Sequence, residues 1–274
     1  MPFKTILLHM TCDERHAARL SAGVSLARRF GAFLEVLYVA SPVTMPAAIS
    51  GRGASYAYLA EATAIAREKA DEVEKEVRRA CKDISFSWTV VEGDHVDRLA
   101  ERADYADLVV VSQPHPDHVE DRVRIMTAEE LPLRAACPVL VLPWMPADTA
   151  PPVGHVLVAW KKTREAGRAV RDALPFLETA ERVTILTIDP PGHTDDTGRD
   201  LMIYLERHGV RTHHHSNLND DDDIGTVILQ VARDLECDGI VMGAYGHSRL
   251  RELVLGGTTR HVLQYMHVPV VMSH

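Results

Sequence analysis

An internal repeat constrains the fold of this 274-residue chain more than any other feature of its sequence. Residues 107–142 (DLVVVSQ…CPVLVL) align without a gap with residues 238–273 (DGIVMGA…VPVVMS), at a constant offset of 131. Residues 6–10 align in the same way with residues 156–160, at an offset of 150. We interpret the chain as a tandem duplication whose first copy contains about 19 extra residues, which we place around 41–61.

In each copy, short runs rich in Val, Ile and Leu alternate with longer stretches of helical period. This alternation is typical of βα units in a parallel sheet, and the almost continuous apolar character of the first and fourth runs predicts strands covered on both faces. The sequence therefore predicts the α/β class, with five parallel strands in an open sheet flanked by helices in each copy. The expected strands are 5–10, 33–39, 85–91, 108–112 and 139–142 in the first copy, and 155–160, 182–188, 210–215, 239–243 and 269–273 in the second.

A proline-rich segment joins the two copies. Residues 143–152 contain four prolines and show no hydrophobic period, which indicates a stiff linker. We therefore expect an N-terminal domain of residues 1–146 and a C-terminal domain of residues 152–274.

Composition and charge argue against several classes of function. The chain is 46% hydrophobic and carries a formal net charge of -9, so it has core-forming material but no overall basic field to attract nucleic acid or anionic lipid. No apolar run approaches the roughly 20 residues that a membrane span needs, and the first residues lack the cleavage site of a signal peptide. We expect a cytoplasmic protein with no nucleic-acid partner and no membrane partner.

A glycine pattern in the second copy is the constellation that carries chemistry. Residues 242–246 read MGAYG directly after the fourth strand, and after nine more residues 256–259 read GGTT at the start of a predicted helix. Glycines let the backbone approach a ligand, and the N–H groups of a helix N-terminus favour an anion. In an open parallel sheet this loop lies at the carboxyl ends of the strands, where ligands bind. The pattern predicts a phosphate site; the alternative is that the glycines only allow a tight turn and close packing.

The spacing GxxG, nine residues, G resembles the nucleotide-binding motif of universal stress proteins. The stretches VLVAWKKTREAGRAV (156–170) and DGIVMGAYGHSRLRELVLGGTTRHVL (238–263) are similar to the second repeat of the tandem members of that family in bacteria. The resemblance covers essentially the whole chain. It implies two Rossmann-like domains, ATP as the ligand with or without Mg, and a sensor or regulatory role in a stress response. It also implies an intrachain pseudo-dimer through the proline-led last strands, and a homodimer of the whole chain is a further expectation.

The same resemblance implies which residues form the adenine-nucleotide site in the second copy. The glycines and threonines would hold the phosphates and ribose, while Met242 and Ile188 would border the adenine. Two positions depart from the family pattern, because Lys161 stands where an acidic residue or Asn is usual and Lys162 where Gly is common. A lysine can pair with phosphate but cannot accept a hydrogen bond from the adenine amino group or the ribose. The expected nucleotide-binding residues are Ala159, Lys161, Ile188, Met242, Gly243, Gly246, Gly256, Gly257, Thr258 and Thr259.

The first copy has lost the glycines of this pattern. The repeat register places Ser112, His115, Ile125 and Met126 where the second copy has Gly243, Gly246, Gly256 and Gly257. Side chains at these positions predict that the first copy has no ordinary nucleotide site. Its extra segment, 41–61, either shapes a different pocket, covers an interface or forms a surface insertion.

Other motifs do not support catalytic or metal sites. His213–His215 alternate along a predicted strand and so cannot easily converge on one ion, while the acidic run 220–223 offers Asp222 or Asp223 as a helix cap. Asp94–His95 and His247–Ser248 lack a third member of a catalytic set, and Glu252 is the one carboxylate within the nine-residue stretch. We therefore expect no catalytic residues and no metal site, and an enzyme only in the form of a weak ATP hydrolase.

Three functions remain open from the sequence. The first is a universal stress protein that binds ATP in its C-terminal domain. The alternatives are a weak ATPase or phosphotransferase that uses the same loops, and a nucleotide-free interaction protein, which Lys161 and the altered first copy favour.

Overall fold

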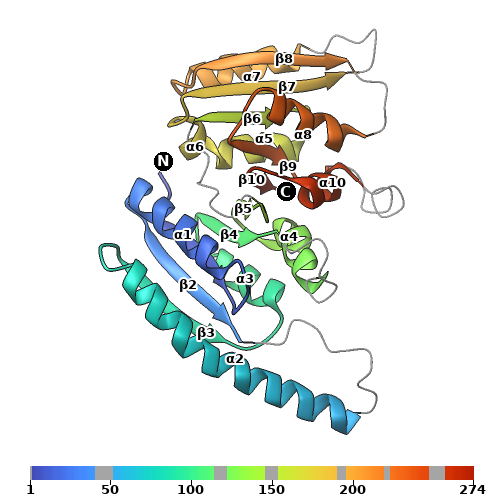
Figure 1. The fold of residues 1–274 in the computed structure, drawn as a ribbon. Helices are drawn as coiled ribbons and strands as arrows, with labels where there is room; N and C mark the ends of the chain where they lie inside the picture. Colours follow the sequence, from blue (N-terminus) through green and yellow to red (C-terminus); the bar gives the residue numbers. More distant parts are fainter. Residues whose placement is uncertain are drawn as a thin grey trace. The chain divides into compact units, whose positions relative to one another are not determined.

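The computed structural model describes residues 2–40, 52–113, 122–145, 154–189, 196–218, 223–246 and 257–274. Their contacts divide the chain into two compact units, an N-terminal unit of Phe3–Cys137 and a C-terminal unit of Pro138–His274 together with Met1–Pro2. Each unit contains an open, mostly parallel sheet flanked by helices (Figure 1). The predicted α/β class is confirmed.

The described part of the N-terminal unit has strands in the order β3-β2-β1-β4, and all three pairings are parallel. The central strands β1 and β4 are apolar because both of their faces are covered, and Leu108 to Val111 of β4 are at most 1% exposed. On α2, Ala70, Val73 and Val77 recur at helical spacing and form its buried side. The elements are β1 (Thr5–Met10), α1 (His16–Phe30), β2 (Phe33–Val39), α2 (Arg52–Ala80), β3 (Phe86–Val91), α3 (His95–Ala103), β4 (Leu108–Ser112) and α4 (Arg122–Arg134).

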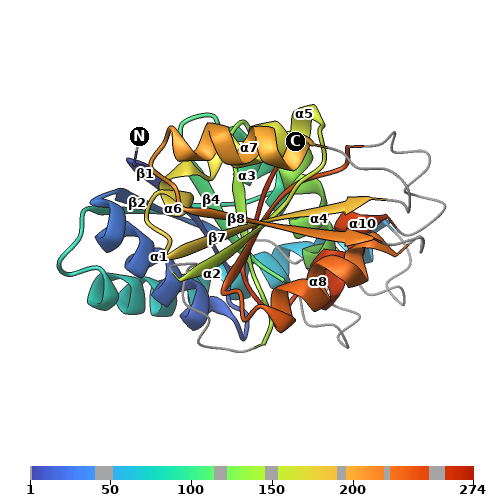
Figure 2. The same cartoon turned by 90° about the horizontal axis from the view of Figure 1, so that it is seen from above.

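The described part of the C-terminal unit has strands in the order β5-β10-β9-β6-β7-β8. The pairings from β10 to β8 are parallel, and β5 is antiparallel to β10. Figure 2 shows α5 and α7 on one face of this sheet and α8 and α10 on the other. The elements are β5 (Val139–Leu142), β6 (His155–Ala159), α5 (Arg164–Asp172), α6 (Leu174–Leu177), β7 (Arg182–Asp189), α7 (Thr197–Glu206), β8 (Thr212–Leu218), α8 (Ile224–Asp234), β9 (Gly239–Gly243), α10 (Thr258–Tyr265) and β10 (Val270–Ser273).

The strands agree with the sequence prediction to within one residue at almost every boundary. The exception is β8, which we expected at 210–215 and which spans Thr212–Leu218. Its register with β7 explains the shift, because every residue from Thr212 to Leu218 pairs with one from Val183 to Asp189. The length of the partner strand sets this boundary, and hydrophobic alternation in the polar run THHHSN could not reveal it.

The last strand of the first copy belongs to the C-terminal unit. β5 pairs with β10 through the register Val141 with Val270, Leu140 with Val271 and Val139 with Met272. This pairing explains why the two compact units divide at Pro138, before the proline-rich segment that divides the repeats. Residues 146–153 lie outside the described residues, so the domain limits 1–146 and 152–274 stay a prediction from the repeat.

The extra segment of the first copy is described only from Arg52, where α2 begins; residues 41–51 lie outside the described residues. None of the helices in the described ranges is long and apolar enough to cross a membrane.

His267, just before β10, should make the C-terminal unit sensitive to acid. Within the described residues neither ring nitrogen has a hydrogen-bond partner, and burial, followed by the charge of Arg233, lowers the pKa of His267. The unfolded chain takes up this proton near pH 6.5, whereas the folded chain takes it up only at lower pH, so stability falls as the pH drops below about 6.5. We expect His267→Leu to reduce the loss of thermal stability between pH 7 and pH 5, as measured by calorimetry. An unchanged loss would contradict this assignment.

Candidate functional site

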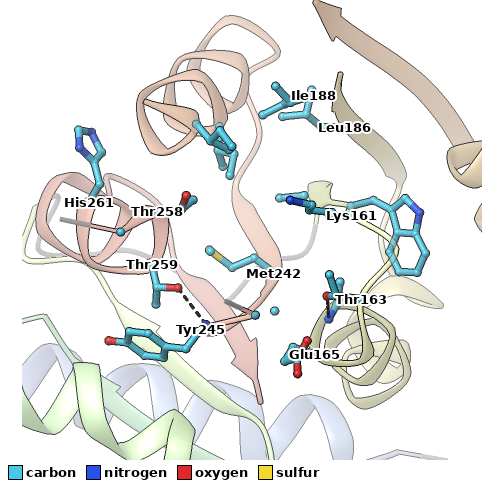
Figure 3. A pocket seen from close by; sticks show the side chains of 18 of the residues that line it. Lys161, Thr163, Glu165, Leu186, Ile188, Met242, Tyr245, Thr258, Thr259 and His261 are labelled. Atoms are coloured by element: carbon cyan, nitrogen blue, oxygen red, sulfur yellow. Dashed lines mark hydrogen bonds between the residues drawn. The ribbon is translucent and has the colours of Figure 1, made fainter. Parts of the chain in front are cut away.

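The C-terminal sheet changes its direction of winding between β6 and β9. From β6 the chain adds β7 and β8 on one side, and β9 and β10 lie on the other side. In doubly wound sheets the carboxyl ends of the strands at such a switch point form a crevice for ligands. A pocket of about 630 Å³ lies at this place, and Figure 3 shows the side chains around it.

Nine of the ten predicted nucleotide-binding residues border this pocket. They come from the end of β6, the end of β7, the loop after β9 and the start of α10, and are Ala159, Lys161, Ile188, Met242, Gly243, Gly246, Gly257, Thr258 and Thr259. Gly256, the tenth, lies outside the described residues. The structure brings these residues together, and their role in binding a nucleotide stays a prediction.

Gly243, at the end of β9, is required for packing. A Cβ atom at this position would lie 2.6 Å from the backbone N of Ala166 and 2.7 Å from the backbone C of Glu165. The first turn of α5 therefore rests directly on the glycine. The packing interpretation of the motif holds for this residue, and any effect of Gly243 on a ligand is exerted through the position of α5.

Gly246 is different, because a Cβ atom at this position would make only ordinary van der Waals contacts. The nearest atom to a Cβ there would be a Glu165 carboxylate oxygen at 3.4 Å. The preceding residue, Tyr245, has a φ of 53°, a conformation that is rare for a bulky side chain. Its N–H donates to Thr259 Oγ1 at 3.2 Å, which ties the glycine loop to the first turn of α10. This hydrogen bond fixes the loop against the start of the helix.

The N-terminus of α10 faces the pocket without a side-chain cap. Gly257 is the N-cap residue and has no side chain that could accept from the first N–H groups of the helix. Gly257, Thr258 and Thr259 all border the pocket. The first N–H groups of the helix, which have no acceptor within the helix, and the positive end of the helix dipole therefore face the pocket, where they favour an anion.

The N-terminus of α5 supplies a carboxylate that the sequence analysis did not single out. Thr163 caps this helix, since its hydroxyl accepts from the N–H of Ala166 at 3.2 Å. Burial by itself would raise the pKa of Glu165, but hydrogen bonds from its own N–H and from the Thr163 hydroxyl, together with the charge of Arg164, outweigh burial and hold the pKa below its usual value. An ionised carboxylate therefore lies beside the glycine loop. The cap motif TREA was the available signal for it.

A hydrogen-bonded cluster connects α8 to α10 at the opposite side of the pocket. The N–H and hydroxyl of Thr226 both donate to Asp223, which is the N-cap of α8, as one of the two predicted caps. Thr226 Oγ1 also lies 3.0 Å from His261 Nε2, and His261 Nδ1 lies 3.4 Å from Asp223 Oδ1. The Thr226 hydroxyl is the main cause that lowers the pKa of Asp223. Asp223 and His261 both border the pocket. His261 could not be predicted from the sequence, because its partner, the helix cap Asp223, is 38 residues away in the chain.

One wall of the pocket is apolar. Leu186 and Ile188 on β7, Met242 on β9 and two isoleucines of α8, Ile224 and Ile228, line it. Figure 3 shows Lys161 extending into the pocket toward the space between Met242 and the Leu186–Ile188 pair. The pocket thus combines an apolar wall with a donor-rich end at α10, and Lys161 points toward the apolar wall. Trp160, Thr163, Ala166 and Tyr245 complete its lining.

The corresponding edge of the N-terminal unit holds buried charges. Arg19 on α1 donates from Nη2 to Asp13 Oδ2 at 2.6 Å and from Nε to the carbonyl of His9 at 2.7 Å. The side chains of Arg19 and Asp13 are 3% and 1% exposed. The ring of His9, at the end of β1, in turn contacts His95 with a nitrogen to nitrogen distance of 2.9 Å. Polar side chains of the protein itself therefore pack at the carboxyl end of β1.

Several residues considered in the sequence have structural roles. Asp94 is the N-cap of α3, with its carboxylate accepting from the N–H of Asp97, and His95 makes the buried contact with His9. His214 Nε2 lies 2.9 Å from Thr187 Oγ1. Of the four residues that replace the glycines in the first copy, Ser112 ends β4. His115 and the side chains at 125 and 126 lie outside the described residues. The same holds for His247–Ser248 and Glu252.

Fold and pocket together define a doubly wound α/β protein with a candidate anion site at its strand switch. The model of the universal stress protein family matches residues 2–143 and 215–274, and the chain belongs to this family. A universal stress protein from Archaeoglobus fulgidus has a similar structure, with a TM-score of 0.75 and 17% identity over 98% of this chain and 95% of that one. A functionally unknown protein from Pseudomonas aeruginosa aligns over 99% of this chain and 92% of its own, with a TM-score of 0.61 and 16% identity. A universal stress protein from Synechocystis is 46% identical over 44 residues, which is 16% of this chain and 15% of that protein.

Proposed function

We propose that the C-terminal unit binds a nucleoside triphosphate such as ATP, with or without Mg²⁺, and that the protein acts as a nucleotide-dependent regulatory module. The observation that carries this proposal is the N-terminus of α10, which opens without a side-chain cap into the pocket at the strand switch. The N–H groups there match phosphate, and the wall formed by Leu186, Ile188 and Met242 matches the face of a base.

The residues present fit such a ligand in two respects. The volume of about 630 Å³ lies within the range of small-molecule pockets. No side chain at Gly246 or Gly257 fills the space between the loop and the helix, so a phosphate can approach the backbone. Glu165 works against a bare polyanion at this end, and a bound Mg²⁺ would offset its charge.

The proposal extends to the arrangement and location of the chain. We expect the two copies to pair through their last strands, and the antiparallel pair β5–β10 supports this. We also expect the protein to act in the cytoplasm.

Thr258→Glu provides a direct test, because it places a negative charge at the first residue of α10. An acidic residue there interacts favourably with the helix dipole, so the variant should fold, but its charge should repel phosphate. We expect native mass spectrometry to show one ATP per wild-type chain in Mg-ATP, and titration calorimetry to show at least about tenfold weaker binding by Thr258→Glu.

Gln264→Glu is the matched control, since it adds the same charge near the other end of the same helix, at an exposed side chain that does not border the pocket. It should bind ATP as the wild type does. If neither ATP nor inorganic triphosphate binds to the wild-type protein, the proposal is wrong and an interaction module without nucleotide becomes the better explanation. If the adduct has the mass of ADP, the weak ATPase becomes the better explanation.

A further inference from the structure

Lys161 lies at the centre of the strand switch. It follows β6 by two residues, and β6 is the strand that has β7 on one side and β9 on the other. The side chain is exposed, and it borders the pocket rather than turning away from it. Figure 3 shows that it extends between Met242 and the pair Leu186–Ile188. A ligand that fills the pocket therefore covers Lys161.

The surroundings of this side chain determine which part of a nucleotide it would meet. Met242, Leu186 and Ile188 are apolar and suit the flat face of a base. The N–H groups that suit phosphate belong to α10, whose first residues Thr258 and Thr259 lie across the pocket in Figure 3. A nucleotide with its phosphates at α10 and its ring on the apolar wall brings an edge of the base to Lys161.

A lysine ammonium group donates hydrogen bonds and accepts none. It therefore matches a carbonyl oxygen on the base and opposes an amino group, which is itself a donor. The same chemistry makes lysine and arginine partners of the O6 and N7 atoms of guanine, whereas adenine presents an amino group at its sixth position. A donor that a ligand buries against another donor makes no hydrogen bond with it, which reduces binding.

We infer that Lys161 makes this pocket selective for nucleotides whose base carries a carbonyl oxygen where adenine carries its amino group. The inference rests on the proposed function, because it assumes that the pocket holds a nucleotide with its phosphates at α10. ATP still binds through its phosphates, but more weakly than a 6-oxopurine nucleotide.

The test compares ATP with inosine triphosphate, which share the ribose and triphosphate. Their bases differ at the sixth position, where a carbonyl oxygen replaces the amino group, and at N1, which carries a proton in inosine triphosphate. Titration calorimetry with the full chain should give a Kd for inosine triphosphate at least about tenfold lower than that for ATP. Lys161→Met keeps the length of the side chain and removes the donor. It should abolish the preference, chiefly by weakening the binding of inosine triphosphate.

Lys162→Met is the control, because Lys162 is adjacent and exposed but does not border the pocket. It should keep the preference of the wild type. Equal Kd values for the two nucleotides in the wild type would overturn the inference, and so would an equal loss for both in Lys161→Met, which would place the lysine at the phosphates. Binding of inorganic triphosphate without a base preference would leave the phosphate site standing. Failure of all three ligands would overturn the proposed function as well.

Discussion

Gly243→Ala should destabilise the C-terminal unit and weaken nucleotide binding together. The new methyl group would lie 2.6 to 3.0 Å from the backbone of Glu165 and Ala166, and backbone atoms cannot move aside as the end of a flexible side chain can. The first turn of α5 must shift away from β9, which typically costs about 1–3 kcal/mol. Because Thr163 and Glu165 border the pocket from this turn, we expect at least about tenfold weaker ATP binding. Urea denaturation and titration calorimetry would measure the two effects.

Gly167→Ala is the control for this substitution, because it adds the same methyl group one turn further along α5. The nearest atom there is the end of the Arg171 side chain at 3.7 Å, and alanine is favoured over glycine inside a helix. This variant should be more stable than the wild type by roughly 0.5–1 kcal/mol and should bind ATP normally. A stable Gly243→Ala protein with unchanged binding would show that α5 does not depend on the glycine.

Gly243 illustrates what the sequence could predict about this site. Glycine spacing indicated the place of the loop and the start of α10, because strand–loop–helix order is local information. The reason for Gly243 was not predictable, because it depends on the distance between β9 and α5, whose contact residues are about 77 positions apart in the chain. His261 was missed for the same reason, since its contact with Asp223 depends on how α8 and α10 pack.

The strands were predictable because burial on both faces imposes a continuous apolar run, as in β4 and β9. Pairing between the last strands of the two copies was expected from the family resemblance, but the register Val141 with Val270 could not be predicted from two short apolar runs. The register of a strand depends on contacts with residues far away in the chain. Apolar runs in the sequence therefore predicted where the strands lie, whereas their pairing register is known only from the structure.

The two copies use the same sheet edge in different ways. The offset of 150 places Asp13 over Thr163 and Arg19 over Ala169. In the second copy a small residue on α5 and a helix cap leave room for the pocket, whereas in the first copy an arginine reaches from α1 to the end of β1. In the first copy a buried ion pair thus takes the place that the pocket has in the second copy. Its stability should depend on both partners.

Asp13→Ala should produce the largest loss of stability among these variants. The substitution removes the carboxylate that accepts from Arg19 at 2.6 Å and from the N–H of Arg15 at 2.6 Å. Arg19, with a side chain only 3% exposed, would keep its charge with its main counter-charge gone. Breaking a buried ion pair by removing one partner typically costs about 3–5 kcal/mol. Urea denaturation followed by circular dichroism would measure this loss.

Asp83→Ala provides the matched comparison, since Arg28 also donates to Asp83 through two nitrogens, at 2.7 and 2.8 Å. Both of those side chains are more than half exposed, so water replaces the lost carboxylate and the denaturation midpoint should stay close to that of the wild type. The contrast isolates burial as the cause, because the pair chemistry is the same. Equal losses for Asp13→Ala and Asp83→Ala would show that the end of β1 is hydrated in solution and does not depend on a buried ion pair.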